Sequence, residues 1–246
     1  MRLNGKTAIV TGGASGFGAG IVDVFLAEGA QVMIADINGT AAAARAAKTG
    51  ALAQTVDVSD AGSVTAMAQA AHQAWGHVDI LVNNAGITHM PAPLDEIEES
   101  DFDRVYAVNM KSVYLTARAL VPGMKARNSG AILNVASTAG LSPRPNLNWY
   151  NASKGWMITA TKTMAVELAP QGVRVNAICP VAGETPLLAS FMGQDTPETR
   201  AKFLSTIPLG RFSQPQDMGQ AACFLCSDEA SMITGTALEV DGGRCI

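Results

Sequence analysis

Short, wholly apolar runs alternate along the chain with longer stretches in which apolar residues recur every three or four positions. A strand that is apolar throughout is buried on both faces, as in a parallel sheet covered by helices. The pattern therefore predicts about seven strands, at 6–12, 30–37, 51–58, 78–86, 130–137, 173–180 and 236–243.

The longer stretches predict the helices between these strands. The first follows the glycines after the first strand and ends at Gly29, and the others are expected at 39–48, 60–75, 103–126, 150–169 and 215–227. Strands that alternate with helices through right-handed crossovers give an α/β fold with a doubly wound parallel sheet. Since no linker or internal repeat interrupts the pattern, we predict a single domain over residues 1–246.

Residues 182–210 do not follow this pattern. They contain three prolines and an amphipathic middle, and they come directly after the sixth predicted strand. Long irregular insertions at the carboxyl end of a strand often cover a substrate. We therefore expect a substrate lid here.

Composition narrows the class of protein. The 246 residues are 48% hydrophobic and 15% charged, which is too apolar for disorder and ample for a core. No apolar run reaches the ~18 residues of a membrane span, and the first apolar run is short and has no cleavage site after it. With a net charge of −4, we expect a cytoplasmic protein that binds neither membrane nor nucleic acid.

The four cysteines do not form a metal-binding pattern. Cys223 and Cys226 make a CxxC within an amphipathic helical pattern, while Cys179 and Cys245 stand alone. No second pair and no histidine cluster completes a ligand set. We predict buried thiols and no metal.

The stretch "TGGASGFG" (11–18) joins the first predicted strand to the first helix. Gly12, Gly16 and Gly18 allow a tight turn and a close backbone approach to a pyrophosphate, and the helix N-terminus offers free N–H groups to it. The strand-to-helix context makes this spacing typical of a dinucleotide site.

Acidic residues end the next two strands. Asp36 could accept hydrogen bonds from both adenosine ribose hydroxyls and would repel a 2′-phosphate; no Arg or Lys lies between Val32 and Ala44. Alternatively, Asp36 is a charge at a helix start that Asn38 caps. We favour ribose recognition, hence NAD over NADP. Asp57-Val58 could hold the adenine edge or form a plain strand-end turn.

Five stretches, in this order, resemble the classical short-chain dehydrogenases/reductases (SDRs): "TGGASGFG", "NNAG" (83–86), Asn109 in "VNMKS", Ser137 in "VAS" and "YNASK" (150–154). The resemblance covers essentially the whole chain. It implies a Rossmann-type sheet, hydride transfer between an alcohol and NAD, and a homotetramer. Other stretches, such as "GETPLLASFMGQDTP", resemble the branch that includes 4-formylbenzenesulfonate dehydrogenase and members described as glucose 1-dehydrogenases or 3-oxoacyl reductases.

The resemblance also implies the site residues. One departure is that the Pro-Gly expected after the sixth strand is Pro180-Val181 here, with Gly183 displaced, which leaves the path of this loop open. The implied catalytic residues are Asn109, Ser137, Tyr150 and Lys154. The implied cofactor contacts are Gly12, Ser15, Gly16, Phe17, Gly18, Asp36, Asp57, Val58, Asn84, Ala85, Gly86, Tyr150, Lys154, Pro180, Gly183 and Thr185, the last of these to the nicotinamide carboxamide.

Tyr150 and Lys154 lie four positions apart and so share a helix face. A tyrosine with a pKa near ~10 is a poor base, but a nearby ammonium and the positive nicotinamide ring favour the phenolate. We predict Tyr150 as acid/base and Lys154 as its tuner and as a ligand of the nicotinamide ribose. Ser137 would orient the substrate oxygen, and Asn109 a water linking Lys154 to solvent. On spacing alone, the pair could be a solvated helix face.

The expected substrate pocket is largely apolar, with polar anchors at His89 and Arg144 and an acid at Glu184. Such a pocket suits a medium-sized alcohol or aldehyde, aromatic or anionic. Trp149 either lines it or packs behind it. The other expected walls are Met90, Leu141, Pro143, Pro145, Leu187, Leu188, Phe191 and Met192.

Three other functions stay open. They are reduction of 3-oxoacyl thioesters, oxidation of sugars or polyols, and an inactive dinucleotide sensor; the last is disfavoured because Tyr150 and Lys154 are both present. The predicted helices 103–126 and 150–169 are apolar on more than one face. Such helices need a second partner surface, which agrees with a homotetramer.

Overall fold

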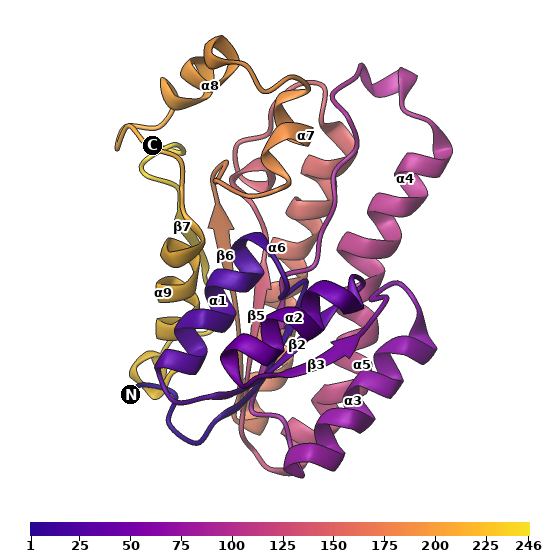
Figure 1. Ribbon diagram of the computed structural model, residues 1–246, viewed down its shortest axis with the longest axis vertical. Coiled ribbons are helices and arrows are strands. Elements are labelled where there is room, and N and C mark those ends of the chain that lie inside the picture. Colours follow the sequence, from indigo (N-terminus) through magenta and orange to yellow (C-terminus); the bar gives the residue numbers. More distant parts are fainter.

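The computed structural model describes all residues, 1–246, and its strands form one parallel sheet (Figure 1). The sheet order is β3-β2-β1-β4-β5-β6-β7, so it is the seven-stranded, doubly wound α/β fold that the sequence predicts. The strands are β1 (Thr7–Thr11), β2 (Gln31–Asp36), β3 (Leu52–Thr55), β4 (Ile80–Asn83), β5 (Gly130–Val135), β6 (Val173–Pro180) and β7 (Ala237–Val240).

Helices connect the strands close to the predicted bounds. The long helix expected at 103–126 begins earlier and is divided by a π-helical turn, η2 (Ala107–Lys111). The helices are α1 (Gly16–Ala27), α2 (Gly39–Thr49), α3 (Ala61–Trp75), α4 (Glu99–Tyr106), α5 (Ser112–Ala126), α6 (Asn148–Leu168), α7 (Leu188–Met192), α8 (Pro197–Leu204) and α9 (Pro215–Cys226), with short 3₁₀ turns η1 (Leu94–Glu96), η3 (Thr138–Gly140), η4 (Ala169–Gln171) and η5 (Asp228–Ala230).

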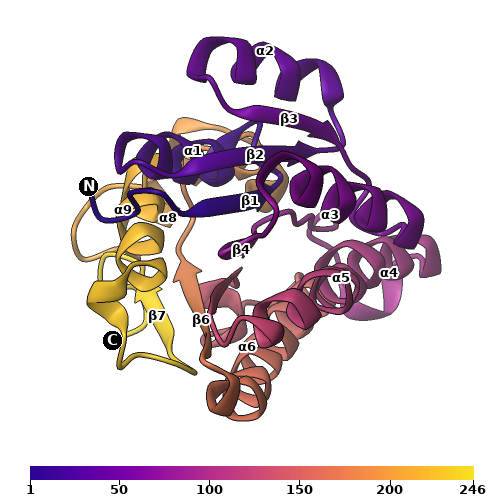
Figure 2. The ribbon, with the colours of Figure 1, turned by 90° about the horizontal axis from the view of Figure 1, so that it is seen from below.

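The core lies in two layers, one on each face of the sheet (Figure 2). On one face α1 and α9 pack through residues such as Phe25 and Met218. On the other, α3, α5 and α6 pack through residues such as Met67, Met124 and Leu168. Burial of strand residues on both faces explains why the strands read as continuous apolar runs.

The strand order reverses between β1 and β4. Connections leave these two neighbouring strands in opposite directions, and in such sheets the divergence opens a crevice at the carboxyl ends. The segment expected to be a lid folds into α7 and α8 above this edge of the sheet (Figure 1). The fold therefore brings the glycine loop, the ends of β4 and β5, and this segment together.

None of the helices combines the length and the hydrophobicity that a membrane-spanning segment requires.

Candidate active site

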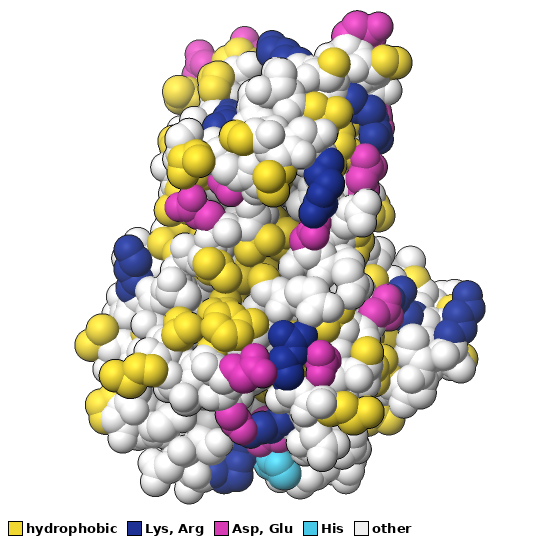
Figure 3. All heavy atoms as spheres, turned by 90° about the vertical axis from the view of Figure 1, so that its left-hand side faces the viewer, with side chains coloured by type: hydrophobic (Ala, Val, Ile, Leu, Met, Phe, Trp, Pro, Cys, Tyr) yellow, Lys and Arg dark blue, Asp and Glu magenta, His cyan; other side chains and the backbone are white.

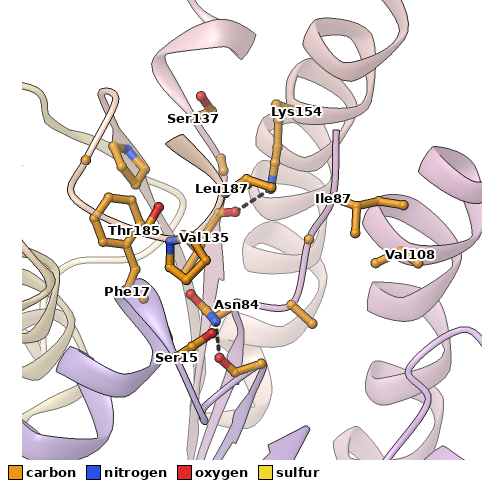
Figure 4. Close-up of a pocket in the computed structure, with 18 of the residues that line it drawn as sticks. Ser15, Phe17, Asn84, Ile87, Val108, Val135, Ser137, Lys154, Thr185 and Leu187 are labelled. Atoms are coloured by element: carbon orange, nitrogen blue, oxygen red, sulfur yellow. Dashed lines mark hydrogen bonds between the residues drawn. The ribbon is translucent and has the colours of Figure 1, made fainter. Parts of the chain in front are cut away.

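A cavity of about 420 Å³ runs along the carboxyl ends of the central strands. Of the sixteen sites implied for cofactor contact, all but Gly18 line it, and Ser137 lines it as well. Figure 4 shows these residues converging from the glycine loop, from the ends of β4 and β5, and from α6. Two implied residues, Gly18 and Asn109, do not line the cavity. They pack against segments that do: Gly18 against the glycine loop and Asn109 against the segment after β4.

The glycine loop is shaped for an anion. Gly12 and Gly16 have positive φ angles of 63° and 53°, which favour glycine. Ser15 precedes α1 without capping it through its side chain, so first-turn N–H groups remain for a ligand. Gly18 does not line the cavity: a Cβ there would overlap the Gly12 carbonyl, so the bare Gly18 lets α1 pack against the loop. Its contact with the cofactor stays a prediction.

Asp36 and Asp57 lie at the far end of this groove. The Asp36 carboxylate accepts hydrogen bonds from the N–H groups of Ala14 (3.0 Å) and Asn38 (2.9 Å), so it is fixed in place. Asn38 also caps α2, so Asp36 itself is not the cap. Asp57 accepts from the Ser59 N–H and hydroxyl, and these bonds lower the pKa of Asp57. Asp57 therefore both stabilises the strand-end turn and faces the cavity.

Asn84 fastens the end of β4 to the glycine loop. Its side-chain amide donates to the carbonyls of Thr11 (2.9 Å) and Gly12 (3.0 Å), and its own N–H donates to the Thr11 hydroxyl. Figure 4 shows Asn84 beside Ser15 beneath the cavity. The motif "NNAG" thus fixes the spacing between two sides of the groove.

The loop after β6 takes a path that the sequence left open. Val181 is buried at the position where the family has glycine, and Gly183 pairs with Ser213 across an isolated β-bridge. A Cβ at Gly183 would overlap the ring of Phe17. Thr185 lies against Gly16. The displaced glycine is therefore required by the aromatic side chain at the start of α1.

Tyr150 and Lys154 occupy one face of α6, and both are almost completely buried. The Lys154 ammonium lies 5.9 Å from the Tyr150 ring centroid and donates to the Val135 carbonyl at 2.8 Å (Figure 4). Because both side chains are buried, the alternative that they form a solvated helix face is excluded.

The titration of these two groups follows from burial. Desolvation raises the pKa of Tyr150 to about 12, with the Ser137 hydroxyl and Arg144 lowering it less. We expected a lowered pKa through Lys154; in the protein itself burial outweighs the nearby cations. Burial lowers the pKa of Lys154 to about 8. Tyr150 is therefore a protonated phenol at neutral pH, suited to donate a proton.

Asn109 sits in the π-helical turn η2, fully buried. Its side chain accepts from the N–H of Ile87 and donates to the Ile87 carbonyl and the Ser153 hydroxyl. π-bulges often occur at functional sites. Asn109 thereby ties α6 to the loop that follows β4, and it has no direct hydrogen bond to Lys154.

At the substrate end of the cavity, only some of the predicted wall residues line it. Leu187, Phe191 and Arg144 line the cavity, and the Phe191 ring stands 5.1 Å from the Tyr150 ring. Trp149 packs against Phe102 and donates to the Leu94 carbonyl, so it lies outside the lining. The expected residues Met90, Leu141, Pro143, Pro145, Leu188 and Met192 do not line the cavity either.

Of the predicted polar residues of the substrate pocket, too, only some line the cavity. His89 is buried and its Nδ1 faces the Met90 carbonyl, outside the lining. Glu184 forms an ion pair with Arg200. Only Arg144 among the three lies in the cavity. The cavity is also lined by residues that were not predicted but adjoin the motifs, namely Ile37, Val56, Ile87, Val108, Val135, Ala136, Thr138, Val181, Ala182 and Pro186. Most of them follow strand ends, and Val108 precedes Asn109 in η2, so their position beside the predicted site residues was the available signal.

No cysteine lines the cavity, although Cys179 lies near Ser137, Tyr150 and Lys154. The four thiols are free, and Cys179, Cys223 and Cys226 are buried. Glu239, Asp241 and Cys245 place ligand atoms within 4.8 Å of one another. However, both carboxylate oxygens of Asp241 accept backbone N–H groups, from Gly243 and Cys245. This cluster is engaged in shaping the C-terminal turn.

Comparison with known proteins fits this geometry. A family model described as enoyl-(acyl carrier protein) reductase matches residues 12–244. The chain is 48% identical to 4-formylbenzenesulfonate dehydrogenase of Comamonas testosteroni, with all of both chains covered. The chain belongs to the short-chain dehydrogenase/reductase family. It is thus an oxidoreductase of a family that uses a nucleotide cofactor.

Two other SDR relatives widen the range of chemistry. The chain is 40% identical to a 3-oxoacyl-[acyl-carrier-protein] reductase of Thermotoga maritima, with all of both chains covered. A solved 3-ketoacyl-(acyl-carrier-protein) reductase from Brucella melitensis, complexed with NADH, matches at 49% identity and a TM-score of 0.95. That match covers 99% of this chain and 100% of the other. Similar scaffolds therefore serve different substrates.

Proposed function

We propose that this SDR interconverts an alcohol and a ketone or aldehyde with NAD as cofactor and Tyr150 as general acid/base. The observation that carries the proposal is the single cavity in which the glycine loop, Asp36, Ser137, Tyr150 and Lys154 all meet. The chain's own residues fit the cofactor, because α1 presents uncapped N–H groups beside glycines that leave room for a pyrophosphate.

A nicotinamide dinucleotide held by the glycine loop, Asp36 and Lys154 would supply or accept the hydride. Ser137 donates a hydrogen bond to the substrate oxygen and holds it near the phenol of Tyr150. In reduction, Tyr150 gives its proton to that oxygen; in oxidation, it takes the proton back. Lys154, whose pKa of about 8 leaves it mostly charged at pH 7, stabilises the phenolate and binds the nicotinamide ribose.

NAD is proposed over NADP because Asp36 is a fixed carboxylate at the adenosine end. Its two oxygens are oriented by the N–H groups of Ala14 and Asn38, and the structure has no ion pair to Asp36. A carboxylate there suits ribose hydroxyls and repels a 2′-phosphate. The relative complexed with NADH supports this choice.

A homotetramer is also proposed. Apolar side chains are exposed on α4, α5 and α6, including Tyr106, Tyr114, Trp156 and Val166. A second exposed apolar region lies on the side of α9 and β7 (Figure 3), where Leu238 is exposed. Two separate self-complementary surfaces are what a dimer of dimers requires. Light scattering that shows a monomer would contradict it.

Steady-state assays test the main proposal. Purified enzyme is given NADH or NADPH with a panel of aryl and aliphatic aldehydes, ketones, 3-oxoacyl thioesters and ketoses, and NAD⁺ or NADP⁺ with the alcohols. We expect turnover with NADH on aryl or aliphatic carbonyls. Turnover confined to 3-oxoacyl thioesters, as the two acyl-carrier-protein reductases suggest, would favour that second function. Turnover confined to sugars would contradict the first.

A further inference from the structure

Two arginines near the substrate end of the cavity have no partner. Arg144 lies between η3 and α6 and lines the cavity; Arg244 lies in the C-terminal segment, and both are half-buried. Neither guanidinium takes part in an ion pair or a hydrogen bond. Every other arginine in the chain donates at least one side-chain hydrogen bond.

The two unpaired charges also act on each other. Burial lowers the pKa of Arg144 first, and the positive charge of Arg244 lowers it further. No carboxylate forms an ion pair with either guanidinium, and the acids that line the cavity, Asp36 and Asp57, lie at its nucleotide end. Glu184 is engaged with Arg200. A half-buried cation without a counter-charge is costly unless a ligand supplies one.

Arg144 is held in a definite orientation. Its Cζ atom lies 4.6 Å from the centroid of the Phe203 ring on α8. A guanidinium over an aromatic ring is stabilised by the ring and keeps its N–H edge free. That edge matches the two oxygens of a carboxylate or sulfonate. Arg144 is also close enough to Tyr150 to lower the pKa of its phenol.

We propose that the substrate carries a carboxylate or sulfonate group that Arg144 binds, with Arg244 adding a second positive charge. The reacting carbon then lies at Ser137 and Tyr150, and the anionic group lies away from the dinucleotide. The substrate class is therefore an organic anion that bears an alcohol, ketone or aldehyde. This inference rests on the proposed function, since it concerns the same cavity.

Matched pairs of aldehydes test the anion site. Initial rates with NADH are measured on 3- and 4-carboxybenzaldehyde and on their neutral methyl esters. Wild-type enzyme should prefer an acid to its ester. Arg144→Met should lower kcat/KM for that acid about 100-fold, the usual size of a lost charge-assisted pair. It should lower kcat/KM for the ester far less, because the ester loses only the effect of Arg144 on the Tyr150 phenol. Arg144→Lys should fall between them, and Arg244→Met should cause a smaller loss confined to the acid.

The exposed Arg118, on α5 and outside the cavity, provides the matched control. Arg118→Met should leave both substrates unchanged. If Arg144→Met lowers the rates on acid and ester equally, with the same shift of both pH profiles, Arg144 acts by positioning Tyr150 or α8 and the anion site is wrong. A wild-type preference for the esters would also overturn it.

A binding measurement separates this inference from the proposed function. Calorimetric titration of benzoate and of benzamide into enzyme saturated with NADH needs no turnover. We expect benzoate to bind more tightly than benzamide, and Arg144→Met to abolish the difference. That result supports the anion site even if no aldehyde is reduced, in which case only the proposed function fails. Equal binding of both probes, or no binding of benzoate to the wild type, would overturn the site.

Discussion

The two ends of the cavity are built in opposite ways. At the nucleotide end, polar side chains are already satisfied by the protein: Asp36 holds the N–H groups of Ala14 and Asn38, and Asn84 holds the carbonyls of the glycine loop. At the substrate end, Arg144 and Arg244 have no partner, and the walls come from the segments after β5 and β6 and from α7.

The polar groups of the nucleotide end are fixed by the protein itself, whereas the charges of the substrate end are left for a ligand to neutralise. Satisfied polar groups on strand ends hold a rigid surface, which suits a cofactor that is always the same. Unpaired charges on loops and short helices cost stability until a substrate supplies the counter-charge. The relatives named for different substrates fit a common scaffold with a variable substrate end.

The largest effect on activity is expected at Tyr150, where the nucleotide end and the substrate end of the cavity meet. Tyr150→Phe keeps the ring that packs on Phe191 and removes only the proton donor. We expect kcat to fall about 10³-fold, within the range for general acid/base catalysis, while NADH affinity stays the same. Stopped-flow rates and NADH fluorescence titration measure the two. A kcat within tenfold of wild type would show that another group moves the proton.

Adding one methyl group in the glycine loop should disrupt the nucleotide end of the cavity. In Gly18→Ala the new Cβ would overlap the Gly12 carbonyl, so the loop must shift. We expect NADH affinity to fall by about 100-fold and the free energy of unfolding by about 1–3 kcal/mol. Gly123→Ala in α5 is the control, since its Cβ would make only ordinary contacts and should not destabilise the protein. Equal behaviour of the two variants would refute a tightly packed loop.

Lys154 links stability to pH. Its folded pKa of about 8 lies below the ordinary value of 10.5, so between these values the unfolded chain binds a proton that the folded protein does not. Stability from this group therefore rises with pH. Between pH 7.5 and 9.5 the unfolding free energy should rise by about 2 kcal/mol more in wild type than in Lys154→Met. Urea unfolding measures it, and parallel curves would contradict the buried cation.

The preference for NADH over NADPH tests the role of Asp36 at the nucleotide end. Asp36→Asn removes the charge at the ribose position, so we expect the ratio of NADH to NADPH affinity to fall about tenfold or more. Asp57→Asn makes the same charge change in the same groove and should leave that ratio unaltered. Competitive fluorescence titration gives both ratios. An unchanged ratio in Asp36→Asn would mean that Asp36 only orders the turn.

The smallest effect on activity is expected on the outer side of the segment 182–210. Glu184 and Arg200 form a largely exposed ion pair, and such pairs contribute little. Glu184→Gln should change KM less than twofold for any substrate that the enzyme accepts. A much larger rise in KM would place Glu184 in the substrate site after all.

The sheet and the nucleotide end were predictable because local pattern and chemistry agree there. Buried strands read as apolar runs, and glycines at this spacing between a strand and a helix are typical of a dinucleotide site. Even so, the packing of Gly18 on its own loop could not be foreseen, since spacing cannot tell a glycine that faces a ligand from one that faces its own loop. Only the distance to the Gly12 carbonyl decides that.

The substrate end was less predictable because distant segments build it. Trp149 adjoins Tyr150 in sequence but points toward α4, as helix periodicity turns neighbouring residues to different faces. The pKa of Tyr150 could not be foreseen either, since it depends on how completely the phenol is buried. The lack of partners for Arg144 and Arg244 appears only once every nearby carboxylate has a position.

The most direct test of the account is the fate of a labelled hydrogen. An alcohol deuterated at its carbinol carbon, chosen from those that the enzyme oxidises, is incubated with NAD⁺, and the reduced cofactor is analysed by mass spectrometry. Transfer across one cavity predicts deuterated NADH from the wild type and a rate about 10³-fold lower in Tyr150→Phe. NADH without deuterium, or full activity in Tyr150→Phe, would contradict it.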